Sequence, residues 1–278
     1  MYKTLAPGCI GHGKTFKEAA IPAAKHGFEG YWFDIVSDSR VDLSETRELL
    51  EQSKLRASGF SLPVEFRTDE ETYRQDMEKL PSFAKYAAEI GANRCITWIM
   101  PGSETYDYAE NFEQHRSRLK PAAEIFKDHG ILFGLEFIGS PDLINSAKFK
   151  FIHDLDRMLE LCDVIGTGNC GILVDIWHWD MAGQTRDDFK KFTNPDQIVL
   201  VHINDAPAGI PVGQQRDGLR KLPGETGVLR IAEFFDGLKS AGYTGPVMPE
   251  PFEKKLAEMS FEEALETTMT SINKVWPE

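Results

Sequence analysis

The pattern that most constrains this chain is an amphipathic helical segment that ends near a glycine and is followed by a short apolar segment. It recurs along the chain, with glycines at Gly27, Gly91, Gly130 and Gly242. A glycine after a helix favours the left-handed cap conformation that other residues resist. The apolar segments are nearly continuous rather than alternating, which is typical of parallel strands buried on both faces. We therefore expect helices to alternate with buried parallel strands.

Eight such strands can be counted, and this alternation predicts an α/β fold, a single (β/α)8 TIM barrel. The main alternative, an open doubly wound sheet, usually carries a glycine-rich phosphate loop after its first strand. The segment from Gly11 to Lys14 is too short for that loop. We expect one domain over residues 1–278, with an active-site loop at 204–227. The strands are expected around residues 4–8, 30–35, 57–64, 93–100, 131–137, 171–176, 198–203 and 246–250.

Charge and composition exclude several classes of function. The net charge is −13, and there is no basic run, so a nucleic-acid backbone would be repelled. No apolar segment is long enough for a transmembrane helix, and the N-terminal residues lack the apolar core of a signal peptide. The 4 cysteines show no CxxC spacing and read as core thiols of a reducing compartment. We expect a cytoplasmic protein without nucleic-acid or membrane partners.

Four residues that can hold a divalent metal each follow one of the last apolar segments. They are Glu136, Asp175, His202 and Glu250. In a barrel the C-terminal ends of the strands meet at one face, where active sites lie. Buried carboxylates are costly unless they are partnered, and a shared metal satisfies several together. This oxygen-rich set with one imidazole predicts a site for Mn²⁺, Mg²⁺, Co²⁺ or Zn²⁺.

At this point the sequence resembles a known family, the xylose-isomerase-like TIM-barrel superfamily of sugar isomerases and epimerases. It is closest in motif to inosose (2-keto-myo-inositol) isomerases and ketose 3-epimerases. The likeness covers nearly the whole chain in layout and is sharp from about residue 125 onward. The segments that carry it are Leu-Glu136-Phe-Ile-Gly-Ser-Pro, Ile-Leu-Val-Asp175-Ile-Trp-His178-Trp, Val-His202-Ile-Asn-Asp205 and Leu-Pro-Gly-Glu225-Thr-Gly.

The resemblance implies roles for individual residues. The four candidate ligands would hold the metal, with Mn²⁺ as the first expectation, and Glu136 and Glu250 would also be the catalytic acid and base. Substrate contacts are implied for His178 and for an arginine of the loop after strand seven. Arg220 fits that arginine best, and Arg216 is the alternative. The implied activity is isomerisation or epimerisation of an inosose or ketose through a metal-bound enediolate, and the sequence does not decide between the two reactions.

Three neighbouring features have two interpretations each. Trp98, near the end of strand four, is either a core residue or a pocket wall. Asp142 is either a solvated loop residue or a contact to a substrate hydroxyl. Trp177 and Trp179 either pack between barrel and helices or stack on a sugar. Glu250 stands between two prolines, which cannot donate ladder hydrogen bonds, so we expect a short or bent strand end there.

Other activities share this site. A lyase or dehydratase, similar to dehydroshikimate dehydratases or C-glycoside-cleaving enzymes, is the main alternative. Apurinic endonucleases of the superfamily need histidines on strands two and three, where this chain has Asp34, Ser61 and Glu65. A non-catalytic sugar-binding protein is a further alternative. The expected partner is a small sugar or inosose, and the resemblance also allows a homo-oligomer.

Overall fold

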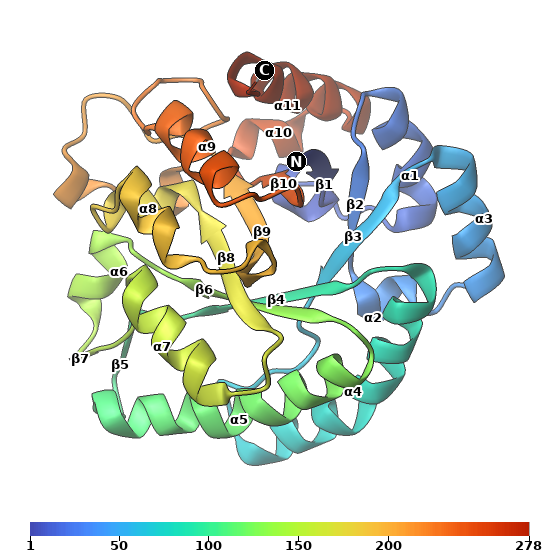
Figure 1. The fold of residues 1–278 in the computed structure, drawn as a ribbon. Coiled ribbons are helices and arrows are strands. Elements are labelled where there is room, and N and C mark those ends of the chain that lie inside the picture. The colour runs from blue at the N-terminus through green and yellow to red at the C-terminus, as the bar shows by residue number, and fades with distance from the viewer. Residues whose placement is uncertain (278) are drawn as a thin grey trace.

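A computed structural model describes residues 1–277 and shows a closed barrel of eight parallel strands with helices around it (Figure 1). The strands follow one another around the barrel in chain order, and the last strand pairs with the first. The predicted (β/α)8 barrel is confirmed. Its strands are Tyr2–Leu5 (β1), Gly30–Phe33 (β2), Arg56–Ser61 (β3), Arg94–Ile99 (β4), Leu132–Phe137 (β6), Cys170–Asp175 (β8), Ile198–Ile203 (β9) and Pro246–Pro249 (β10).

Seven helices of ten or more residues cover the outside of the barrel within the described residues. Gly27, Gly91, Gly130 and Gly242, which follow four of them, all have positive φ between 68° and 90°. This conformation is the one that the glycine pattern predicts. The helices are Phe16–Lys25 (α1), Leu43–Ser53 (α3), Glu70–Ile90 (α4), Tyr108–Asp128 (α5), Leu155–Ile165 (α7), Ile231–Ser240 (α9) and Phe261–Val275 (α11).

Shorter elements lie mostly in the loops that follow the strands, so they build the C-terminal mouth of the barrel. They include two short strands that form an antiparallel pair outside the barrel. The short elements are Pro7–Ile10 (η1), Ile35–Asp38 (α2), Gly102–Ser103 (β5), Pro141–Ser146 (α6), Phe149–Lys150 (β7), Ile176–Met181 (α8), Arg186–Lys191 (η2), Pro195–Gln197 (η3), Val212–Gln214 (η4), Asp217–Leu219 (η5) and Lys254–Glu258 (α10).

The core has two parts. The larger part lies between the strands and the surrounding helices, and a smaller cluster fills the inside of the barrel. Side chains of a strand alternate between these two environments, because successive residues point to opposite faces. The barrel therefore has a packed floor beneath its mouth. The inner cluster consists of Trp32, Ile96, Leu173, Val199, Leu200 and Met248.

Most strand boundaries differ by one to three residues from those expected; β1, for example, is Tyr2–Leu5 rather than 4–8, and β3 ends at Ser61 rather than 64. Two differences bear on the site. Strand β8 ends at Asp175, one residue earlier than expected, because the Asp175 side chain accepts a hydrogen bond from the Trp177 amide and starts α8. The segment 204–227, expected as an irregular loop, contains η4 and η5 and is closed at its base by a bridge between Asp205 and Lys221. The segment is therefore an ordered cover rather than a slack connection.

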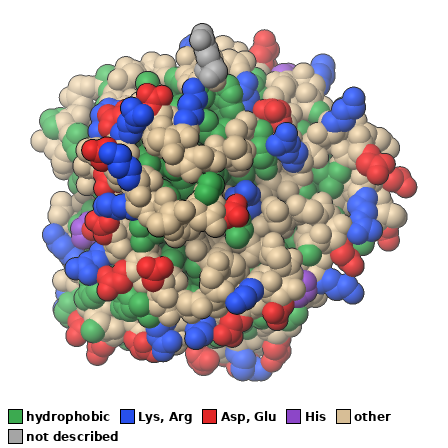
Figure 2. Space-filling model, in the orientation of Figure 1, with side chains coloured by type: hydrophobic (Ala, Val, Ile, Leu, Met, Phe, Trp, Pro, Cys, Tyr) green, Lys and Arg blue, Asp and Glu red, His purple; other side chains and the backbone are tan. Residues whose placement is uncertain are grey.

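The distribution of charge on the surface agrees with the absence of a basic run in the sequence (Figure 2). On the face shown in Figure 2, basic and acidic side chains are interspersed, and no continuous basic area is visible there. Among residues 1–277, no helix combines the length and the apolar character needed to cross a membrane.

Candidate metal centre

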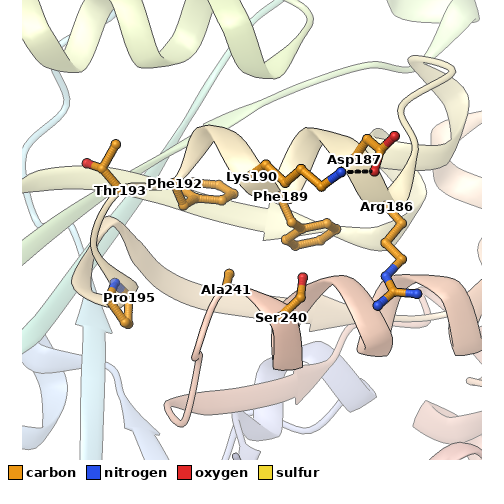
Figure 3. A pocket seen from close by; sticks show the side chains of 9 residues that line it. All are labelled: Arg186, Asp187, Phe189, Lys190, Phe192, Thr193, Pro195, Ser240 and Ala241. Atoms are coloured by element: carbon orange, nitrogen blue, oxygen red, sulfur yellow. Dashed lines mark ion pairs between the residues drawn. The ribbon is translucent and has the colours of Figure 1, made fainter.

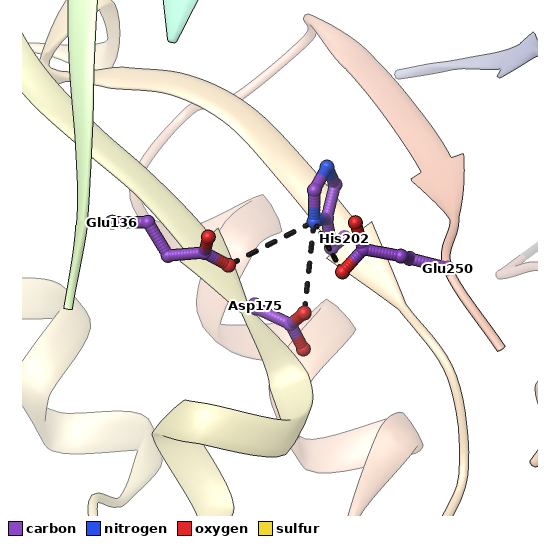
Figure 4. Close-up of side chains that lie close together, drawn as sticks. All are labelled: Glu136, Asp175, His202 and Glu250. Atoms are coloured by element: carbon purple, nitrogen blue, oxygen red, sulfur yellow. Dashed lines mark ion pairs between the residues drawn. The ribbon is translucent and has the colours of Figure 1, made fainter. Parts of the chain in front are cut away.

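The four predicted ligands converge at the mouth of the barrel, at the ends of β6, β8, β9 and β10. Each of Glu136, Asp175, His202 and Glu250 offers one ligand atom, and these atoms all lie within 4.8 Å of one another. His202 Nδ1 is central: it lies 3.3 Å from Glu250 Oε2, 3.6 Å from Asp175 Oδ2 and 3.8 Å from Glu136 Oε1 (Figure 4). Three carboxylates therefore surround one imidazole nitrogen.

Backbone and side-chain contacts aim two of these carboxylates. Asp175 Oδ1 accepts hydrogen bonds from the Trp177 amide (2.7 Å) and from Asn204 Nδ2 (3.0 Å), which leaves Oδ2 facing the other ligands. The Glu250 amide donates to the Ile203 carbonyl (3.1 Å), so the chain stays beside β9 after β10 has ended. The flanking prolines therefore do not turn Glu250 away from the site.

Arg220 reaches the same oxygens from the 204–227 segment. Its Nη1 donates to Asp175 Oδ2 (2.7 Å) and to Glu250 Oε2 (2.5 Å). Its Nη2 donates to Asp217 Oδ1 (2.8 Å) and lies 2.9 Å from His178 Nε2. The Arg220 residue is only 2% exposed. It is thus a buried cation that links the covering segment to the ligand set.

The environment moves the pKa values of the four ligands in different directions. Burial raises the pKa of Glu136 well above its usual value, and the carboxylates of Glu250 and Asp175 add to that rise. Burial acts the same way on Glu250 and Asp175, but His202 and Arg220 hold the pKa of both below the usual range. Burial alone would lower the pKa of His202, yet the three carboxylates, Glu250 first, raise it to about 10. The centre is thus a strongly coupled set of charges.

The donor set fits a divalent cation. Glu136 Oε1 and both ring nitrogens of His202 are buried and have no hydrogen-bond partner among the described residues. Buried polar atoms without partners are rare and call for an explanation. An ion held by one imidazole and three carboxylates would give Glu136 Oε1 and one nitrogen of His202 their missing partner.

The histidine and the two tryptophans of α8 are buried. His178 is fully buried beneath Arg220, and burial together with the Arg220 charge lowers its pKa to about 4. Its contact with substrate remains a prediction. Trp177 and Trp179 are 0% and 1% exposed. The packing interpretation of these two tryptophans is confirmed, and the stacking interpretation is wrong for this conformation.

The other predicted contacts lie nearer to solvent. Trp98 is 43% exposed, so it is not a core residue. Asp142 is partly exposed in α6, and its Oδ1 accepts a hydrogen bond from Ser140 Oγ (2.8 Å). Arg216 is exposed, in contrast to Arg220, so the geometry favours Arg220 as the arginine of the site.

Sequence reasoning missed two neighbours of the ligands. Asn204 is fully buried and holds Asp175, and Cys9 Sγ lies 3.9 Å from Glu250 Oε1. Asn204 stands two residues after His202 and could have been found from its place at the end of a strand. Cys9 lies in η1 just after β1, and no local pattern separates it from a core thiol.

A separate cavity of about 540 Å³ lies outside the barrel between η2 and α9 (Figure 3). Phe189, Phe192 and Pro195 form its apolar wall, and an ion pair between Lys190 and Asp187 lies at its edge. None of the four candidate ligands lines it. This cavity is therefore separate from the candidate metal centre.

Comparison with known proteins decides the family. The family described as xylose isomerase-like TIM barrel matches residues 21–273. The chain belongs to this family. It is similar to an inosose isomerase of Halalkalibacterium halodurans, with 30% identity over 149 residues, which is 54% of this chain and only 49% of that protein. It is also similar to an L-ribulose 3-epimerase of Methylomonas sp., with 23% identity over 257 residues, which covers 87% of this chain and 80% of that protein.

A solved structure shares the fold. An IolI protein described with a binding zinc atom superimposes with a TM-score of 0.82, at 18% identity, over 99% of this chain and 98% of that chain. At this identity the likeness establishes the barrel and its layout, not the reaction.

Proposed function

We propose that this protein is a divalent-metal-dependent isomerase or epimerase of small ketoses or inososes. The observation that carries the proposal is the convergence of Glu136, Asp175, His202 and Glu250 on one point of the barrel mouth. The similarity to an inosose isomerase and to a ketose 3-epimerase supports the same class of reaction. Both reactions begin when a proton leaves a carbon beside a carbonyl group.

The two glutamates are placed to move that proton. Glu136 and Glu250 come from the two ends of the arc β6–β8–β9–β10, with Asp175 and His202 between them. Figure 4 shows them approaching His202 from opposite sides. A substrate carbon held between them would have a carboxyl group on each side. Return of the proton to the opposite face of that carbon gives epimerisation, and its transfer to the neighbouring carbon gives isomerisation.

The two glutamates share the proton transfer. One of Glu136 and Glu250 would take the proton from the carbon beside the carbonyl group, and the other would return it.

The same four side chains would hold the metal, with Mn²⁺ as the first expectation. A bound divalent cation would stabilise the negative charge that develops on the substrate oxygens. The buried Arg220 carries a further positive charge beside Asp175 and Glu250, where it can bind a substrate oxygen. His178, which lies 2.9 Å from Arg220 Nη2, is proposed to contact the substrate beside it, and Trp98 and Asp142 are the proposed outer contacts.

Metal content tests this proposal directly. We expect about one divalent ion per chain by elemental analysis of protein purified without chelator, and loss of activity in EDTA that returns with added Mn²⁺. Metal-free protein with full activity in EDTA would refute the proposed centre. Release of a leaving group from a β-substituted substrate would point to the lyase alternative on the same residues.

A further inference from the structure

Trp98 occupies a defined place beside the metal centre. On β4, Ile96 belongs to the cluster inside the barrel, and Trp98 lies two residues further along, so it faces the same side at the mouth. Its register partner on the neighbouring strand β6 is Glu136. An indole that is 43% exposed therefore stands next to one of the candidate metal ligands.

Arg67 packs against this indole. The guanidinium carbon of Arg67 lies 3.8 Å from the centre of the Trp98 ring. Its Nη2 donates to Thr97 Oγ1 (2.9 Å) and to the Trp98 carbonyl (2.6 Å). Arg67 thus fixes both the ring and the backbone of Trp98. Arg67 has no role in the proposed chemistry.

The segment that carries Arg67 is itself fastened, although it has no regular structure. Glu65 Oε1 accepts hydrogen bonds from the Arg67 amide (2.9 Å) and from Arg67 Nη1 (3.4 Å). Arg118 of α5 donates to the carbonyls of Phe66 (2.8 Å) and Thr68 (2.7 Å). The Phe66 ring lies 4.2 Å from the Arg67 guanidinium carbon. These contacts give Arg67 little freedom to leave the indole.

We propose that Arg67 is a positioning residue that presents Trp98 as a fixed stacking platform for a neutral, ring-shaped substrate. The inference rests on the proposed function and narrows its substrate class. An exposed side chain that is already immobile loses little conformational entropy when a ligand binds against it. A flat aromatic face favours a ligand with a flat apolar face, such as the C–H face of a cyclitol. The positive charge of Arg67 against the ring disfavours a cationic ligand.

The effect of removing Arg67 should appear in binding rather than in the chemical step. We expect Arg67→Ala to weaken binding of 2-keto-myo-inositol about five-fold, because binding would then have to order the Trp98 side chain. KM should rise by a similar factor, with little change in kcat. Arg67→Lys keeps the charge but not the planar fork, so it should recover only part of the loss. L-erythrulose, which is too short to close a stable ring, should be affected less than two-fold.

Two comparisons separate this role from a general structural one. Arg47→Ala is the matched control, because the Arg47 guanidinium also ties two segments together, with two hydrogen bonds to the Glu89 carbonyl, but on the outside of the barrel. It should leave binding unchanged. In a Trp98→Ala background, Arg67→Ala should change binding less than two-fold, because its effect passes through the indole. An equal loss with and without Trp98 would overturn the proposal.

Fluorine NMR tests the positioning without any turnover. The chain has 5 tryptophans, so 5-fluorotryptophan labelling gives few resonances, and Trp98→Phe assigns the one of interest. In the free protein, Arg67→Ala should shift and broaden the Trp98 resonance, whereas Arg47→Ala should not. An unchanged resonance in Arg67→Ala would refute the platform. If the proposed reaction fails in every substrate assay, this measurement still decides the role of Arg67.

Discussion

Asp205 is the residue on which the cover of the site most depends. It is fully buried at the end of β9, and its carboxylate accepts backbone hydrogen bonds from the far end of the 204–227 segment. Oδ2 accepts from the amides of Thr226 (2.9 Å) and Gly227 (2.7 Å), and Oδ1 from those of Val228 (3.2 Å) and Leu229 (3.0 Å). One carboxylate therefore closes the loop that carries Arg220.

Asp205→Asn isolates this function, because it keeps the shape of the side chain. One of the two oxygens becomes an NH₂ group, which faces at least two amide donors and can accept from none of them. A hydrogen bond to a charged group contributes about 1.5–3 kcal/mol, so the loss of two amounts to about 3–6 kcal/mol. Because these hydrogen bonds hold the 204–227 segment and not the strands of the barrel, we expect the segment to open before the barrel unfolds. Arg220 would then leave Asp175 and Glu250.

Two assays follow the change. Urea denaturation should show the free energy of unfolding reduced by about 3 kcal/mol or more, and hydrogen exchange should show faster exchange of the amides at 226–229. Asp69→Asn is the control, because Asp69 is an exposed helix N-cap that accepts from the Thr72 amide, and asparagine caps about as well as aspartate. A loss below 1 kcal/mol with unchanged exchange would refute the reasoning.

Two further predictions concern other buried polar groups. Burial raises the pKa of Asp38 from 3.8 to about 6. Between about pH 4 and 6 the folded protein therefore keeps a proton that the unfolded chain releases. The free energy of unfolding falls by at most about 3 kcal/mol as pH rises through this window, and it is level above it. Asp38→Asn keeps the acceptor for the Phe16 amide but cannot titrate. The melting temperature of the variant minus that of the wild type should therefore rise as pH increases from about 4 to 6. A difference that does not change with pH would contradict the raised pKa of Asp38. Asn204→Ala removes the amide that orients Asp175, and Mn²⁺ affinity measured by calorimetry should fall by about ten-fold. Affinity within two-fold of wild type would show that Asn204 does not orient the ligand.

The sequence predicted the barrel because its signals are local and repeated. Each buried strand is an apolar run and each helix ends near a glycine, and Gly91 and Gly130 adopt the expected positive φ. The strand ends then placed the four ligands, since parallel strands of a closed barrel bring their C-terminal ends to one face. These inferences need only the order of the elements.

What the sequence could not predict depends on contacts between distant segments. The prolines beside Glu250 are visible in the sequence, whereas the hydrogen bond from its amide to the Ile203 carbonyl, which keeps Glu250 beside β9, is not. The contacts of Arg220 with both carboxylates depend on how the 204–227 segment folds back. The stacking of Arg67 on Trp98 depends on the path of the irregular segment after β3, which no local pattern encodes.

Proton exchange with solvent tests the central claim most directly. With 2-keto-myo-inositol or a ketose substrate in heavy water, NMR should show deuterium entering the carbon beside the carbonyl with the wild-type, metal-loaded protein. Glu136→Gln and Glu250→Gln should each abolish that exchange while the fold and metal content are checked separately. Normal deuterium incorporation in either variant would contradict the role assigned to that glutamate.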